Sequence, residues 1–124
     1  MVNDKVQYTS DHLWVRHVKD NLYRIGVTFD YLDRLAAVNI VELPKAGRTI
    51  KQGDSIAVLE SSKAAIEISS PLTGIITKIN VNVVSDPELV NRSPMEDGWL
   101  LEIEVNQLDR LDNLLSEEEY QRLL

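Results

Sequence analysis

Lys63 is the residue whose surroundings most clearly suggest chemistry. Small residues surround it, and the apolar runs 56–59 and 66–68, which are typical of β-strands, flank this stretch. The pattern predicts a hairpin with Lys63 at its exposed tip. No Asn-Gly or Asp-Gly pair marks the turn, so turn chemistry alone does not explain the choice of residues. A lysine at such a tip is accessible to a modifying enzyme. The alternative is that Lys63, like most surface lysines, is only a solvated charge.

The segments before the hairpin predict the elements that position it. Residues 14–18 and 22–27 predict two strands of a hairpin, with an Asp-Asn turn between them. Residues 28–37 change to helical spacing, which predicts a short helix capped near Thr28. Residues 38–43 return to a strand pattern.

The segments after the hairpin predict two more strands and two more helices. Strands are expected at 75–81 and 99–105; in the second, residues 101, 103 and 105 face inward while Glu102 and Glu104 face solvent. Residues 86–91 predict a helix with Asp86 as the cap and a proline at the first helical position. In the tail, Ser116 and Glu119 predict a capping box, and leucines 108, 111, 114 and 115 predict an apolar face.

Composition limits the classes of protein that are compatible with this chain. Its 124 residues, 44% hydrophobic and 27% charged, predict a single domain over 1–124, with an N-terminal extension at 1–7 and a helical tail at 106–124 packed on the body. A net charge of −7 argues against a nucleic-acid partner. There is no cysteine, so disulfides and thiol nucleophiles are excluded. No apolar run is long enough to cross a membrane, and the first residues lack the pattern of a signal peptide.

The stretch around Lys63 resembles the lipoylation hairpin of the glycine cleavage system H protein. The resemblance rests on residues 60–65 followed by 70–74, and it extends from about Tyr8 to the last residue. Further matching motifs, in the same order and spacing as in the family, lie at 8–15, 26–28, 41–44, 87–91 and 97–100.

The resemblance implies a fold, a cofactor and a set of site residues. The implied fold is mainly β, the barrel-sandwich hybrid of lipoyl and biotinyl carriers, with short peripheral helices and a C-terminal helix. Lipoate is expected on Lys63; biotin is less expected, because biotin carriers usually place methionines where Ser62 and Ala64 stand. Candidates for the arm cleft and for recognition by the lipoate-attaching enzyme are Glu60, Ser62, Ala64, Glu67, Asp11 and His12. No metal site is expected, since the two histidines have no metal-ligand spacing.

The implied function is that of a carrier without catalytic residues of its own. By resemblance, the arm accepts the aminomethyl group of glycine from a pyridoxal-phosphate glycine dehydrogenase. It passes the group to a tetrahydrofolate-dependent aminomethyltransferase, and an FAD-containing dihydrolipoamide dehydrogenase then reoxidises the arm. We expect a monomer in the bacterial cytoplasm, or in the mitochondrial matrix if a presequence has been removed.

The chain departs from the family pattern at four places away from the lysine. Leu13 replaces the acid that follows the family's histidine, and residues 35–37 lack its glycine and acid. Arg34 stands where a histidine is often found, and Met95 replaces a tyrosine. These changes bear on the cleft that holds the loaded arm, where an ammonium group needs a carboxylate; Glu67 and Asp11 are the acids that remain to supply one.

Two other functions remain open at this point. The first is an H-like lipoate carrier that serves lipoate relay or sulfur metabolism. The second is an unmodified interaction domain in which Lys63 is a surface charge. Attachment of lipoate to Lys63 would exclude the second.

Overall fold

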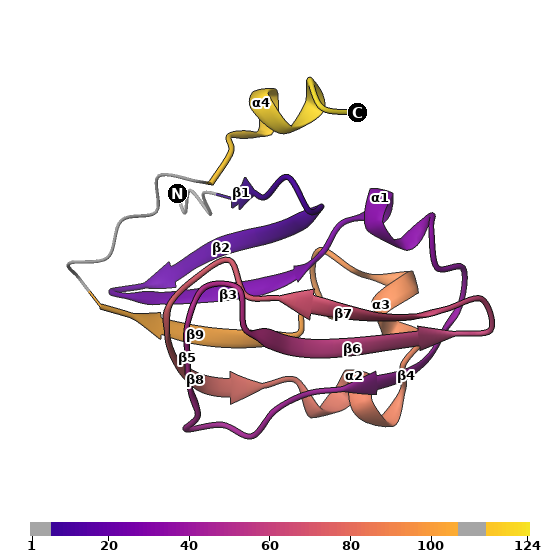
Figure 1. The fold of residues 1–124 in the computed structure, drawn as a ribbon, viewed down its shortest axis with the longest axis horizontal. Coiled ribbons are helices and arrows are strands. Elements are labelled where there is room, and N and C mark those ends of the chain that lie inside the picture. Colours follow the sequence, from indigo (N-terminus) through magenta and orange to yellow (C-terminus); the bar gives the residue numbers. More distant parts are fainter. Residues whose placement is uncertain (1–5, 107–113) are drawn as a thin grey trace.

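The structure, a computed structural model, describes residues 6–106 and 114–124 and consists of two antiparallel β-sheets with short helices around them (Figure 1). The strands of the first sheet lie in the order β1-β2-β3-β9-β8-β5, and those of the second in the order β4-β6-β7. In chain order the strands are β1 Val6–Tyr8, β2 Leu13–Lys19, β3 Leu22–Val27, β4 Val38–Glu42, β5 Thr49–Ile50, β6 Ser55–Ser61, β7 Ala65–Ser69, β8 Gly74–Ile79 and β9 Leu101–Val105. The helices are α1 Phe29–Leu32, α2 Val81–Ser85, α3 Leu89–Arg92 and α4 Glu117–Gln121. The predicted barrel-sandwich hybrid is confirmed.

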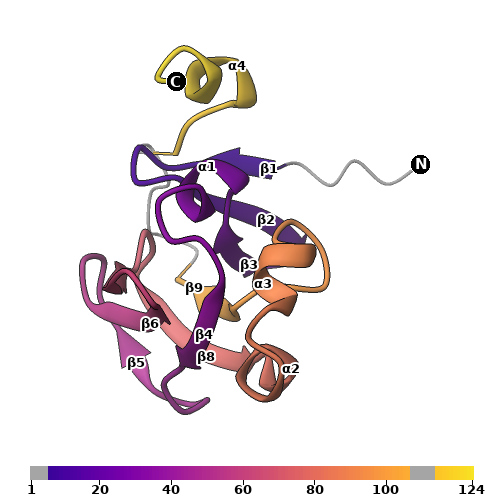
Figure 2. The same cartoon turned by 90° about the vertical axis from the view of Figure 1, so that its right-hand side faces the viewer.

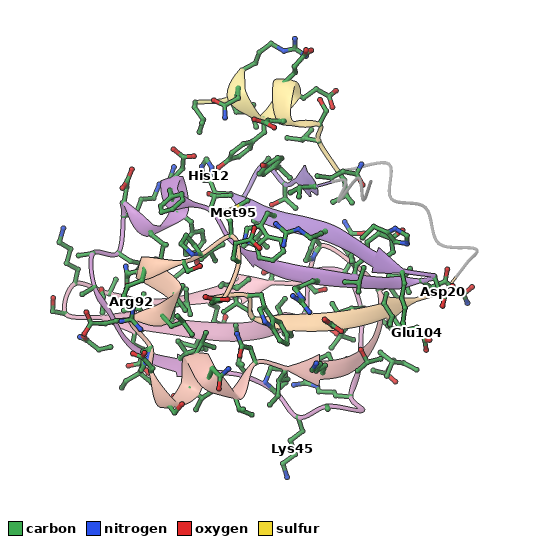
Figure 3. The ribbon with its side chains drawn as sticks, turned by 180° about the vertical axis from the view of Figure 1, so that it is seen from behind. His12, Asp20, Lys45, Arg92, Met95 and Glu104 are labelled. Carbon is green, nitrogen blue, oxygen red and sulfur yellow. The ribbon has the colours of Figure 1, made fainter. Side chains whose placement is uncertain are left out.

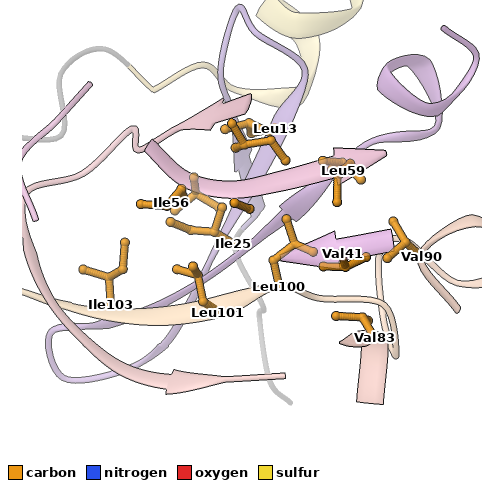
Figure 4. Packing of buried hydrophobic residues seen from close by; sticks show 14 of the residues in the cluster. Leu13, Ile25, Val41, Ile56, Leu59, Val83, Val90, Leu100, Leu101 and Ile103 are labelled. Carbon is orange, nitrogen blue, oxygen red and sulfur yellow. The ribbon is translucent and has the colours of Figure 1, made fainter. Parts of the chain in front are cut away.

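The core lies between the two sheets, where apolar side chains from both meet (Figure 4). Strand β9 contributes Leu101, Ile103 and Val105, as its alternating pattern predicted, and β6 contributes Ile56 and Leu59. On the other face of β9, Glu104 is exposed as predicted, but Glu102 is not. Glu102 is only 7% exposed, because Arg24 on β3 covers it, so its prediction as a solvent-facing residue was wrong.

The β2–β3 hairpin forms as predicted, and Asp20 in its turn has a positive φ of 46°. Helix α1 also begins as predicted, since the Thr28 hydroxyl accepts a hydrogen bond from the Tyr31 N–H. The helix is shorter than the ten residues expected, and Ala36 then adopts a φ of 62°. That conformation is one that glycine adopts more easily, so the missing family glycine coincides with a strained alanine.

The segment between β8 and β9 differs most from the prediction. The expected strand 75–81 ends at Ile79, and the Asn80 side chain then caps α2, a helix that the pattern of β-branched residues did not predict. The predicted helix 86–91 is displaced: α3 is Leu89–Arg92, and Asp86 ends α2 and pairs with Arg92 instead of capping α3.

The first and last described elements, β1 and α4, pack against each other. Val6 and Gln7, expected in an N-terminal extension, form β1 with Tyr8 and pair with β2. The capping box of α4 is confirmed, with both bonds between Ser116 and Glu119 present. Leu114 is buried, whereas leucines 108 and 111 lie outside the described residues. In Figure 2, α4 lies on the β1 side of the first sheet, near α1.

Candidate functional site

Lys63 lies at the tip of the β6–β7 hairpin, which protrudes at one end of the molecule (Figure 1). The Ser61 N–H donates to the Ala64 carbonyl at 2.8 Å, and the Ser61 hydroxyl oxygen accepts from the N–H groups of Lys63 and Ala64 at 3.1 and 3.3 Å. Residues 62 and 63 have no positive φ. A serine side chain therefore closes the turn in place of the missing Asn-Gly pair. Ser62, Lys63 and Ala64 are all exposed.

A cleft of about 470 Å³ lies beside this hairpin. Its lining residues come from the loop before β2 and the first residue of that strand, from α1 and the turn after it, and from β7: Ser10, Asp11, His12, Leu13, Tyr31, Arg34, Ile66, Glu67, Ile68 and Ser69. Three predicted site residues, Asp11, His12 and Glu67, are thus brought together, whereas Glu60, Ser62 and Ala64 belong to the hairpin and do not line the cleft. Glu67 is four residues from Lys63, about 13 Å along an extended strand.

His12 lines the cleft and forms a hydrogen bond with Tyr120 of the C-terminal helix α4. Figure 3 shows His12 on the side of the molecule that faces this helix. Arg34 Nη2 lies 3.1 Å from His12 Nε2, and because a guanidinium can only donate, Nε2 must be the acceptor. The ring proton is therefore on Nδ1, which donates to the Tyr120 hydroxyl at 2.8 Å. Tyr120 is buried, stacks on Tyr8 with centroids 4.7 Å apart, and also forms a hydrogen bond with Thr28, the N-cap of α1. The loop before β2, α1 and α4 thus share one hydrogen-bond network.

Tyr31 and Arg34 also line the cleft. Arg34 is one of the departures from the family pattern that were expected to bear on the cleft, whereas the sequence did not identify Tyr31 as a cleft residue. From its spacing in the sequence, Tyr31 was predicted only to lie on the apolar face of a helix. In the structure its hydroxyl is buried, and no hydrogen-bond partner for it exists among residues 6–106 and 114–124. Burial, with Asp11 adding to it and Arg34 opposing it, raises the pKa of Tyr31 to about 12. The phenol is therefore neutral at physiological pH and lies in the cleft wall.

The raised pKa predicts a titration that can be measured. Neutral Tyr31 contributes stability that is complete below pH 10, the ordinary pKa, and that is lost as the pH rises towards 12. In an ultraviolet titration, Tyr31→Phe should remove a phenol that ionises near pH 12, and it should flatten the fall in stability between pH 10 and 12. A variant that instead loses a phenol ionising near pH 10 would contradict the buried position of this hydroxyl.

Leu13 is only 2% exposed and belongs to the core as well as to the cleft wall. The position that carries an acid in the resembling family is thus apolar and packed here. Asp11 and Glu67 are the two carboxylates that line the cleft. The described part of the chain contains no group of three or more metal-ligating side chains close enough to hold an ion.

Comparisons with known proteins show the family of this chain. The family model described as glycine cleavage H-protein matches residues 6–124. The chain belongs to that family. A probable glycine cleavage system H protein 1, mitochondrial, of Dictyostelium discoideum is 40% identical over 114 residues, which cover 92% of this chain and 78% of that protein. The glycine cleavage system H protein of Pectobacterium carotovorum is 39% identical over 120 residues, covering 97% and 92%.

The fold of the family is also represented among solved structures. A crystal structure of a glycine cleavage system H protein from Mycobacterium marinum superposes with a TM-score of 0.86 at 28% identity, covering 99% of this chain and all of that one. Related H proteins are thus found in bacteria and in a mitochondrion. Within residues 6–106 and 114–124, none of the helices has the length and apolar character needed to cross a membrane.

Proposed function

We propose that this H protein is the lipoyl carrier of a glycine cleavage system and that Lys63 carries the lipoyl group. The observation that supports this most directly is the exposed lysine at a serine-closed turn, beside a cleft that a long acyl arm can reach. Membership of the glycine cleavage H-protein family adds the chemical context.

The residues present fit such an arm. Small, exposed Ser62 and Ala64 leave the Lys63 amine open to an attaching enzyme, and Glu60 at the base of the turn is available for recognition. The cleft begins within about 13 Å of the lysine, which a fully extended lipoyl-lysine side chain spans. Its wall offers two carboxylates and the Tyr31 hydroxyl, which has no hydrogen-bond partner in the part of the chain that the structure describes.

When attached, lipoate would supply a disulfide that can be reduced and that can accept a one-carbon group. The protein itself contributes no catalytic residue in this proposal. Lys63 holds the arm on a mobile side chain, the turn keeps it accessible to each enzyme, and the cleft shelters its end from water. Tethering raises the local concentration of the group at each active site.

The proposed partners are a pyridoxal-phosphate glycine dehydrogenase, a tetrahydrofolate-dependent aminomethyltransferase, an FAD-containing dihydrolipoamide dehydrogenase and a lipoate-attaching enzyme. The net charge of −7 suits brief encounters with more basic docking surfaces. We propose a monomer, in a bacterial cytoplasm or a mitochondrial matrix.

A second candidate function follows from the cleft. The cleft has Leu13 where the family has an acid, and its lining includes Arg34. It is therefore less suited to a cationic end group than a cleft in which carboxylates are the only charged groups. An H-like carrier that serves lipoate relay or sulfur metabolism would not need to bind a cationic end group in its cleft. This candidate keeps lipoate on Lys63 and changes only the enzymes that use it.

One experiment separates these functions. Purified protein is incubated with a lipoate ligase and then assayed for glycine–bicarbonate exchange with a glycine dehydrogenase. We expect one lipoyl group on the peptide that contains Lys63, and exchange activity that disappears completely in Lys63→Ala. Lys45→Ala, at another exposed loop lysine, serves as the matched control and should retain full activity. Full lipoylation without exchange would refute glycine cleavage and favour the second candidate, and absence of lipoylation would refute the carrier function itself.

A further inference from the structure

Arg34 brings a positive charge into a cleft whose other charged lining residues are acidic. Asp11 and Glu67 supply two negative charges and Arg34 one positive charge, so with neutral His12 the lining sums to −1. Among residues 6–106 and 114–124, none of these three side chains forms an ion pair within salt-bridge distance. Their charges are therefore available to a group that enters the cleft.

The guanidinium is held in place by the network of His12. Arg34 Nη2 donates to Nε2 of that ring at 3.1 Å, and Nδ1 of the same ring is tied to the buried Tyr120 hydroxyl at 2.8 Å. His12 cannot rotate without losing both bonds and its edge contact with the Tyr120 ring, whose centroid is 5.6 Å away. An arginine with one end anchored in this way spends less entropy on binding a ligand than a free surface arginine does.

The charges of Arg34 and Asp11 both act on Tyr31 in the cleft wall. Both charges act on the pKa of the Tyr31 phenol, which Asp11 raises and Arg34 lowers. The two side chains thus oppose each other at the cleft wall, and an end group placed near Tyr31 would experience both.

We propose that Arg34 is a specificity-determining residue of the cleft. Its positive charge weakens the binding of a cationic arm end in the cleft and allows an anionic arm end to bind there. The inference rests on the proposed attachment of an arm at Lys63. A charged end group that approaches a guanidinium at a partly solvated site changes its binding equilibrium by about two- to fivefold, with opposite signs for cation and anion.

The test uses arms of known chemistry in place of lipoate. The chain has no cysteine, so Lys63→Cys provides a single thiol in the full-length protein. This thiol is alkylated with arms of equal length that end in a primary ammonium, a carboxylate or a hydroxyl group. Amide chemical shifts of residues 66–69, which line the cleft, report the fraction of each arm that is docked. The docked fraction of each arm is then measured again in a Lys63→Cys protein that also carries Arg34→Gln.

We expect Arg34→Gln to raise the docking equilibrium constant of the ammonium arm two- to fivefold and to lower that of the carboxylate arm by a similar factor. The hydroxyl arm should not change. Arg48→Gln, an exposed arginine outside the cleft, makes the same change in net charge and should alter none of the three. Raising the salt concentration to about 0.5 M should reduce both charge effects.

Equal shifts for the ammonium and carboxylate arms, or no shift for either, would overturn the proposal. A general disturbance of the fold cannot imitate the expected result, because it would move both arms in the same direction. The arms contain no dithiolane and the assay needs no glycine dehydrogenase. Failure of Lys63 to accept lipoate would therefore refute the proposed function without affecting this measurement. A negative result with the synthetic arms would refute the role of Arg34 without affecting the proposed function.

Discussion

Gly74→Ala is expected to lower the free energy of unfolding by about 3 kcal/mol or more. Gly74 begins β8, where it pairs with Val105 of β9 on one side and with Ile50 of β5 on the other. A Cβ at this position would overlap the carbonyl oxygen of Glu104 and lie 2.9 Å from Ile103 Cγ2. A backbone carbonyl in a paired strand cannot move aside as the end of a side chain can. The substitution must therefore separate β8 from β9 locally.

Urea denaturation followed by fluorescence would measure this loss. Gly47→Ala is the matched control, because its added Cβ has no heavy atom of residues 6–106 and 114–124 within 4 Å and its φ of 94° opposes the change. We expect that control to cost about 1 kcal/mol, the strain of a left-handed alanine. If both variants lost the same stability, close contact at Gly74 would not be the cause.

Glu102→Gln should destabilise the protein by about 2–3 kcal/mol, while Glu104→Gln, two residues along the same strand, should change its stability by less than about 0.5 kcal/mol. Glu102 Oε2 accepts two hydrogen bonds from Arg24, at 2.9 and 2.7 Å, and is almost fully buried. The Arg24 guanidinium also lies 4.4 Å from the centre of the Trp99 ring. Removing the carboxylate charge leaves a partly buried guanidinium without its counter-ion.

The pair of variants separates burial from charge. Both substitutions remove one negative charge from β9, but Glu104 is exposed. Denaturation at neutral pH, repeated at about 1 M salt, should leave most of the difference in place, because buried pairs are weakly screened. Similar stabilities for the two variants would show that the ion pair with Arg24 contributes little.

Much of the fold could be read from local patterns. The alternation in 101–105 identified a strand and its inner face because successive side chains of a strand point to opposite sides. Capping positions at Thr28 and Ser116 were also identified, since a cap depends only on residues three positions apart. Where residues with strand preferences form one turn of helix, as in α2, the local pattern was misleading because the Asn80 cap and the packing of Val83 outweighed propensity.

The sequence by itself determined the hairpin, the exposed position of Lys63 and the family, because these depend on neighbouring residues and on the order of motifs. It also placed Asp11, His12 and Glu67 among the candidates. Only the tertiary structure decided that those three share one cleft and that Tyr31 and Arg34 complete it. It likewise decided that Glu102 is buried. These contacts join residues from separate elements, so they depend on how the sheets and helices pack, which local spacing does not encode.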